Sequence, residues 1–158
     1  MVNKSANSNV IAAIFRRRMG NAQKTRLFHE LPDWEQKLLV ENAGLAPDEN
    51  PVIAYLGGDT NWCLVTDRGL AWLNAEGVHY TNIFEVNRIT HDMGAAMQRG
   101  QLDKRQFHEL TVETKRGETA VVELEPGAPF YGVWRALNWM LEWANRPEQK
   151  DSLSSQGA

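Results

Sequence analysis

The stretch between Trp62 and Ile89 restricts the possible folds more than any other part of the chain. It contains short apolar runs, such as Trp62–Val65 and Leu70–Leu73, separated by breaks that carry Asp or Gly. Both residues favour turns, because Asp bonds to the backbone ahead of it and Gly tolerates positive φ. Apolar runs of about four to eight residues between such turns predict antiparallel strands joined as a meander.

Seven strands are expected in all, followed by a helix. The clearest hairpin surrounds Arg116 and Gly117, where apolar and polar residues alternate on both sides of the turn. The polar segment 91–106 is expected to be a long loop or a short helix. A helix is expected over Pro126–Arg146, because Pro129 suits a first turn and Pro147 a stop. The expected strands are Val52–Leu56, Trp62–Val65, Gly69–Asn74, Val78–Thr81, Glu85–Thr90, His108–Lys115 and Thr119–Leu124.

Two further helices are expected before the strands. The first begins at Ser8 or Asn9, either of which suits an N-cap, and continues to about Met19. The second begins with Asp33 as N-cap and ends at Gly44. The chain then divides into a helical extension (1–49), a strand-rich domain (50–146) and a disordered tail (147–158). The apolar faces of the two helices are Val10, Ile11, Ile14 and Phe15, and Trp34, Leu38 and Leu39.

The C-terminal helix is apolar on two sides. One side is expected to cover the sheets, and a second apolar strip faces away from them. A helix that is apolar over more than half its circumference has to be covered twice. We therefore expect the second strip to be a partner interface, covered either by the N-terminal helices or by another copy of the chain. The sheet-facing residues are Phe130, Val133, Trp134, Leu137, Met140, Leu141 and Ala144, and the interface residues are Gly132, Ala136, Trp139 and Trp143.

The charge distribution is uneven. The first 29 residues contain six basic and no acidic side chains, whereas the remainder contains eleven basic and twenty acidic ones, a net charge of −9. Arg16, Arg17 and Arg18 are the candidate contacts for an anionic partner, either phospholipid headgroups or nucleic acid. The alternative is that they form the solvated face of a helix docked on the acidic body.

No pattern of catalytic, metal-binding or cofactor-binding residues is present. The four histidines lack metal-ligand spacing, and the one cysteine, Cys63, lies inside an expected strand, where a buried inert thiol is expected. Nucleotide loops and nucleophile motifs are missing from the sequence. We therefore expect a protein that is not an enzyme and has no cofactor or metal. No secretory leader or membrane-length apolar run occurs, which predicts a cytoplasmic location.

Two runs, LVTDRGL at Leu64–Leu70 and GVHYTNIFEVNRI at Gly77–Ile89, resemble motifs of the bacterial pleckstrin-homology-like (PH-like) domains. The resemblance covers about Asn50–Asn145. It implies an α+β fold in which seven antiparallel strands form a barrel or two orthogonal sheets, capped by a C-terminal amphipathic helix. It also implies a binding or assembly module without catalytic residues, often homo-oligomeric. PH domains that bind phosphoinositides usually carry basic residues between the first two strands, and the corresponding loop Gly57–Asn61 has none.

Three hypotheses for function follow. The first is a non-enzymatic protein-interaction module of PH-like fold that self-associates, so the expected partner is a protein, including another copy of the chain. The second is a small acidic immunity or inhibitor protein that masks a toxin or enzyme, suggested by the acidic body. The third is a peripheral binder of anionic lipid or nucleic acid through the basic arm. Under the first hypothesis no nucleic acid or small-molecule substrate is expected, and a membrane surface is the less favoured partner.

Overall fold

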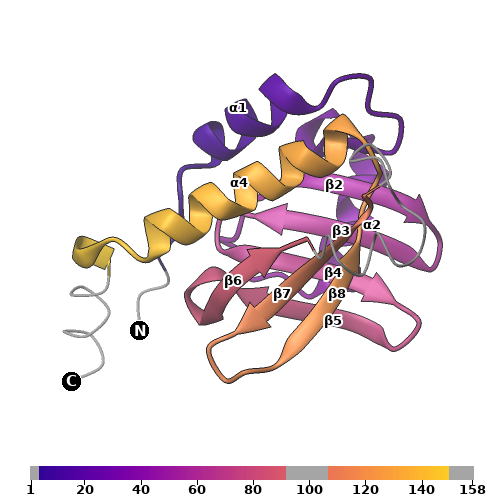
Figure 1. Ribbon diagram of the computed structural model, residues 1–158. Helices are drawn as coiled ribbons and strands as arrows, with labels where there is room; N and C mark the ends of the chain where they lie inside the picture. The colour runs from indigo at the N-terminus through magenta and orange to yellow at the C-terminus, as the bar shows by residue number, and fades with distance from the viewer. Residues whose placement is uncertain (1–3, 92–106, 150–158) are drawn as a thin grey trace.

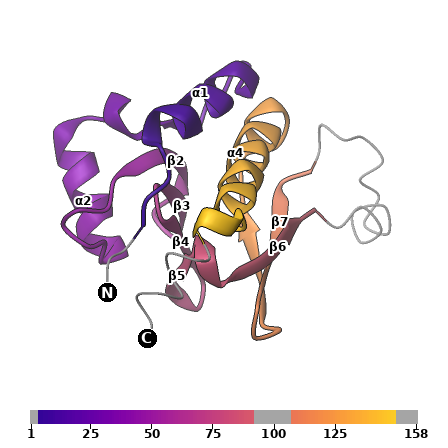
Figure 2. The same cartoon turned by 90° about the vertical axis from the view of Figure 1, so that its left-hand side faces the viewer.

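A computed structural model of the chain describes residues 4–91 and 107–149. The fold is α+β, with two antiparallel sheets of five and three strands (Figure 1). Helices α1 (Ser8–Arg18) and α4 (Ala128–Ala144) lie side by side over one end of the sheets. Helix α2 (Asp33–Ala43) lies on the opposite face of the larger sheet from α4 (Figure 2). Among the described residues the two sheets do not close into a barrel.

The larger sheet contains four of the seven expected strands and one additional strand. Its order is β1-β2-β3-β4-β5, and neighbouring strands are antiparallel. Gly69 begins β4 where that strand passes close to β5, and a side chain there would overlap the Thr81 carbonyl oxygen. The sequence therefore needs glycine after Arg68 for this hairpin to pack. The strands are β1 (Thr25–Leu27), β2 (Pro51–Gly58), β3 (Asn61–Thr66), β4 (Gly69–Asn74) and β5 (Gly77–Asn82).

The smaller sheet contains the remaining three expected strands. Its order is β6-β7-β8, and the expected turn between β7 and β8 places Gly117 at a φ of 87°. One 3-10 turn, η2 (Ile83–Glu85), connects the sheets, and the Asn82 side chain caps it by accepting the Phe84 N–H. The strands are β6 (Val86–Thr90), β7 (Glu109–Thr114) and β8 (Thr119–Glu123). Apart from His91, the segment expected to be a loop or short helix lies outside the described residues.

One hydrophobic core joins α1, β1, both sheets and α4. The expected sheet-facing side of α4 is buried, with Phe130 and Leu137 fully enclosed and Trp134 half-buried. A second cluster fills the space between α2 and the outer face of the larger sheet. The extension 1–49 therefore contributes to the same packed body as the strands, through Ile11, Phe15 and Leu27 among others.

The expected apolar face of α2 is wrong in two of its three residues. Trp34 is 67% and Leu38 is 48% exposed, whereas Leu39 and Ala43 are buried. The helix contacts the sheet through one narrow stripe, because Leu39 and Ala43 stand one helical turn apart. Its N-cap is Pro32, so the expected cap residue Asp33 is already inside the helix.

Two further differences concern the chain ends. The extension expected to be helical contains β1, which pairs with β2, so the structure has eight strands where seven were expected. The N-cap of α1 is Asn7, one residue before the expected Ser8 or Asn9, and its side chain accepts the N–H groups of Asn9 and Val10. Residues 147–149 form a short helical turn, and the rest of the expected tail lies outside the described residues. Within the described ranges, no helix is both long and apolar enough to cross a membrane.

Candidate functional site

Helices α1 and α4 pack against each other through half of the α4 strip that was predicted to be a partner interface. Gly132 and Ala136 are buried, and a β-carbon on Gly132 would lie 3.0 Å from Cδ1 of Phe15. The two helices run antiparallel, because Gly20 after α1 lies beside Ala128 at the start of α4. Helix α1 of the same chain therefore covers this half of the strip.

The other half of the strip stays partly open. Trp139 and Trp143 are both half-buried, and the ring of Trp143 lies 5.5 Å from the ring of Phe84. Of the N-terminal residues expected to cover these tryptophans, Trp34 and Leu38 lie on α2 and are exposed. The two tryptophans therefore have different surroundings, and Trp139 lines a cavity beside α1.

This cavity, the α1–α4 groove, has a volume of about 450 Å³. It brings together candidate residues that lie more than 100 positions apart in the sequence. Arg17 and Arg18 come from the last turn of α1, and Trp139 comes from the middle of α4. Arg16 occupies the same turn of α1 but does not line the groove. The lining residues are Ile14, Arg17, Arg18, Arg135, Asn138, Trp139 and Glu142.

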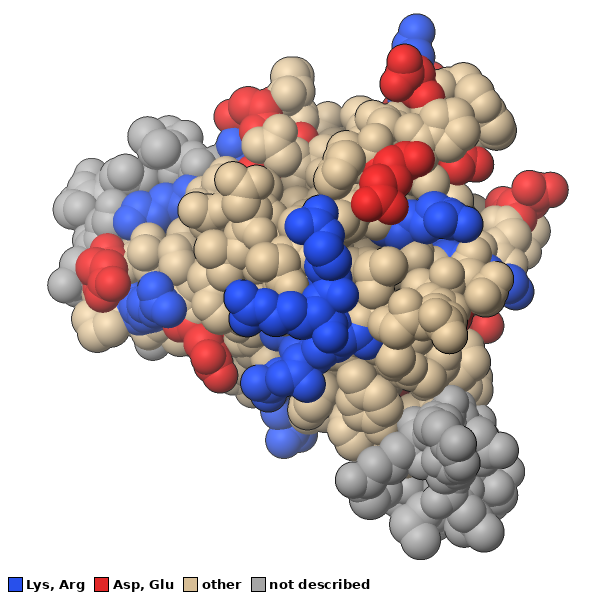
Figure 3. All heavy atoms as spheres, turned by 90° about the horizontal axis from the view of Figure 1, so that it is seen from above, with Lys and Arg blue, Asp and Glu red and all other residues tan. Residues whose placement is uncertain are grey.

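The groove carries uncompensated positive charge. Within the described part of the chain, Arg17, Arg18 and Arg135 have no hydrogen bond or ion pair. Figure 3 shows lysine and arginine side chains gathered on the face formed by α1 and α4. The C-terminal end of a helix favours cations, which stabilises three successive arginines in the last turn of α1. Glu142 adds a single carboxylate to the same groove.

The sequence identified Arg17, Arg18 and Trp139 as candidate contacts but not Arg135. The signal was available, because Arg135, Asn138 and Glu142 form the polar strip of an otherwise apolar helix. The Asn138 amide donates to the Trp134 carbonyl oxygen, which leaves its own oxygen available as an acceptor. Guanidinium groups stay charged at any physiological pH. The groove can therefore hold an anion and stack a flat group on Trp139.

The TDRGL segment, in contrast, is a buried structural cluster. Thr66 donates to Glu49 at 2.6 Å, and Asp67 accepts from both the backbone and the side chain of Asn50. Arg68 is buried and forms a bidentate pair with Asp48, and this hydrogen bond lowers the pKa of Asp48. These contacts within the chain fix the β3–β4 turn.

Two further candidates for chemistry are the cysteine and a grouped metal site. Burial raises the pKa of the Cys63 thiol to about 12, so it is neither a nucleophile nor a metal ligand near neutral pH. In the parts of the chain that the structure describes, no three His, Cys, Asp or Glu side chains are grouped to hold a metal ion. His79 stacks on Trp72 with ring centroids 5.3 Å apart.

The chain matches no protein-family model and no curated protein. Its function therefore has to be inferred from its own residues, and the α1–α4 groove brings three arginines and a tryptophan together at one open site.

Proposed function

We propose that this protein is a non-enzymatic interaction module of PH-like architecture that docks an acidic surface of a partner protein in the α1–α4 groove. The observation that carries the proposal is a set of three arginines, unpaired among the described residues, around a half-buried tryptophan. Arginine and tryptophan are the residue types most enriched among those that dominate binding energy at protein interfaces.

The element order supports the architecture. Strands β2–β5 form one antiparallel group, β6–β8 form a second, and α4 follows them, as in the PH-like order of seven strands and a helix. The buried TDRGL turn between β3 and β4 lies within the motif that resembles this family. Strand β1 and helices α1 and α2 are additions to that order, and α1 supplies one wall of the groove.

The composition of the groove favours a protein over a lipid surface or a nucleic acid. Glu142 lines it beside the arginines and would repel a continuous row of phosphates. A folded partner can place a carboxylate against Arg17 and a cation against Glu142. Charged pairs of this kind set orientation and partner choice, with the aromatic residue supplying contact area.

Another copy of the chain remains a possible partner, because the chain outside its first 29 residues carries a net charge of −9. A symmetric dimer in which the interface strips of two α4 helices meet along their whole length is blocked, since α1 covers Gly132 and Ala136. Self-association would then place an acidic surface of one copy in the groove of the next. Such a head-to-tail contact depends strongly on salt, unlike an apolar one.

Site-specific photo-crosslinking in the native host tests the proposal. A photoreactive amino acid at Asn138 should give a discrete protein adduct, which Arg17→Glu with Arg18→Glu should remove. The same probe at the exposed Lys37 of α2, far from the groove, is the control. Adducts to nucleic acid or lipid alone, or a protein adduct insensitive to the arginines, would contradict the proposal. Sedimentation of the purified protein at about 50 and 500 mM salt measures self-association. An oligomer at the lower salt concentration that dissociates at the higher one would identify the partner as a second copy.

A further inference from the structure

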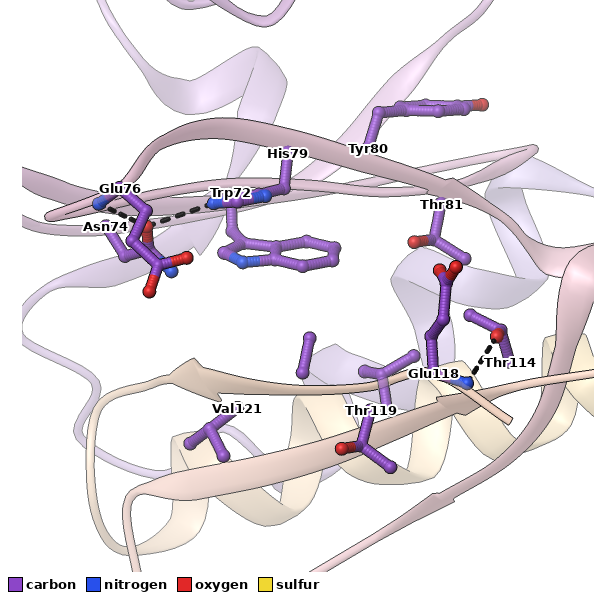
Figure 4. A pocket seen from close by; sticks show the side chains of 12 residues that line it. Trp72, Asn74, Glu76, His79, Tyr80, Thr81, Thr114, Glu118, Thr119 and Val121 are labelled. Atoms are coloured by element: carbon purple, nitrogen blue, oxygen red, sulfur yellow. Dashed lines mark hydrogen bonds between the residues drawn. The ribbon is translucent and has the colours of Figure 1, made fainter. Parts of the chain in front are cut away.

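A second cavity, the inter-sheet cleft, lies away from the α1–α4 groove, between the free edges of the two sheets. Strand β5 is the last strand of the larger sheet and β8 the last strand of the smaller one. The cleft has a volume of about 510 Å³, in the range of ligand pockets, and both sheets line it. Figure 4 shows Trp72 and Thr81 facing Thr119, Val121 and Glu118 across this space.

The two edges offer backbone groups to a ligand. An edge strand presents a row of unpaired N–H and C=O groups on its outer side. In the described residues, β5 forms backbone strand pairs with β4 alone and β8 with β7 alone. A smaller cavity of about 260 Å³ adjoins the inter-sheet cleft. It shares Thr81, Thr114 and Glu118 with the cleft and therefore lengthens it. An extended peptide is the ligand that matches an elongated cleft beside a free strand edge.

Trp72 gives an independent indication of a ligand. Its side chain is only 4% exposed, and its Nε1–H has no acceptor within the described part of the chain. A buried donor without an acceptor is destabilising, because burial removes its hydrogen bond to water and nothing replaces it. One side of the ring is stacked on His79, and Figure 4 shows the other side turned toward the strand that carries Thr119 and Val121. A ligand in the cleft would bring an acceptor next to this buried N–H.

The charge of the cleft indicates which side chain the ligand carries. Glu76 and Glu118 line it from opposite sheets, and neither carboxylate has a cationic partner among the described residues. No Lys or Arg lines the larger cavity, whereas Lys115 and Arg116 border the smaller one. His79 Nε2 is engaged by Asn74 Oδ1 at 3.0 Å. Figure 4 shows Glu76 beside Asn74 at one end of the cleft and Glu118 beside Thr81 at the other, so a cationic side chain at either end would balance a carboxylate.

We propose that the inter-sheet cleft binds an extended peptide segment that carries a Lys or Arg side chain. The segment adds a strand to the free edge of β5. Because side chains alternate along a strand, every second residue points into the cleft, where the cation lies beside Glu76 or Glu118. This site is separate from the α1–α4 groove and does not depend on the function proposed for it.

Selection from a library of displayed linear nine-residue peptides tests the proposal on the full chain. Selection on the wild type should enrich sequences with Lys or Arg among β-branched residues. Synthetic versions should bind at least about tenfold more weakly to Glu76→Gln with Glu118→Gln, the effect expected for losing charge pairs. The matched control is Glu41→Gln, an exposed carboxylate on α2 that lines neither the cleft nor the α1–α4 groove, which should leave binding unchanged.

NMR spectra of the ¹⁵N-labelled protein locate the bound peptide and test its backbone contacts. The Trp72 indole N–H and the β5 amides should shift on binding, and N-methylation of alternate peptide residues should abolish it. Nα-acetyl-lysine amide alone should shift these signals only weakly. No enrichment, enrichment without basic residues, equal binding to the double variant, or full binding of the lysine amide would each overturn the proposal.

Discussion

Phe15 lies against the backbone of Gly132 so closely that a side chain at residue 132 would press on its ring. A β-carbon there would be 3.0 Å from Phe15 Cδ1 and 3.3 Å from the Phe15 carbonyl oxygen. Phe15 is itself fully buried and has little room to move. This contact sets the distance between α1 and α4, and it therefore sets the width of the groove that contains Arg17, Arg18 and Trp139.

Substitution of Gly132 should show the tightness of this contact. In an exposed helix, Gly→Ala stabilises by about 1 kcal/mol, but Gly132→Ala should lose that gain to crowding. Gly132→Leu should destabilise by about 1–3 kcal/mol, because it forces the helices apart. Urea unfolding measures both changes. A stabilised Gly132→Ala protein would show that α1 does not pack here.

Truncation of two leucines should distinguish the buried face of α4 from the exposed face of α2. Leu137 is fully buried, so Leu137→Ala should cost about 2–5 kcal/mol of unfolding free energy. Leu38 is 48% exposed, and Leu38→Ala should change stability by no more than about 0.5 kcal/mol. Comparable losses at the two positions would mean that α2 buries the face expected from its sequence.

The sequence predicted the strands well because their signals are local. Alternation and turn residues between Trp62 and Ile89 define four strands within two residues of their ends. Strand β1 lacks such a signal, since it has three residues and is held by Glu125, about 100 positions later. Helical periodicity identified the apolar residues of α2 but not which of them contact the sheet.

The candidate site was predictable only in parts. The arginines of α1 and the tryptophans of α4 stood out separately, by charge and by size. Their meeting in one groove depends on the antiparallel packing of two helices from opposite ends of the chain. The inter-sheet cleft had no local signal, because its two carboxylates belong to hairpin turns in different sheets.

Glu125 should make stability dependent on pH. Burial alone would raise the pKa of this carboxyl group, but hydrogen bonds from Gln23, Thr25 and Lys24 lower it overall. A lowered pKa means that the stabilisation is fully present above the ordinary value of 4.5 and is lost as the pH falls through the folded-state pKa. Glu125→Gln should therefore destabilise at pH 7 by on the order of 1 kcal/mol, and this difference should shrink in acid.

Urea unfolding of both proteins between pH 7 and pH 3 checks this expectation. Glu123→Gln is the matched control, because Glu123 is exposed at the end of β8, two residues before Glu125, and it should show a much smaller difference. A Glu125→Gln effect that stays constant to pH 3 would show that the carboxylate charge does not hold the segment before β1.

Cys63 should be unreactive in the folded protein. The side chain is 2% exposed, and burial raises the pKa of its thiol to about 12, so almost no thiolate exists at pH 8. Reaction with a disulfide reagent should be slow in buffer and rapid in urea. A cysteine introduced by Thr60→Cys, in the exposed turn between β2 and β3, should react at once and serves as the control. Rapid reaction of native Cys63 would require an opening of β3.

Charge reversal at adjacent arginines should separate binding in the α1–α4 groove from general attraction to a basic surface. Arg16 and Arg17 are neighbours in the last turn of α1, and both are exposed, but only Arg17 lines the groove. Arg16→Glu and Arg17→Glu change the net charge equally, so long-range attraction should fall by a similar amount in both. If the partner docks in the groove, Arg17→Glu should weaken the crosslink from Asn138 at least about tenfold, because it leaves the partner's carboxylate unpaired. Arg16→Glu should weaken it only slightly, and added salt should remove most of that difference. Equal losses of crosslinking from the two variants would show that the partner is attracted by the charge at the end of α1 and does not enter the groove.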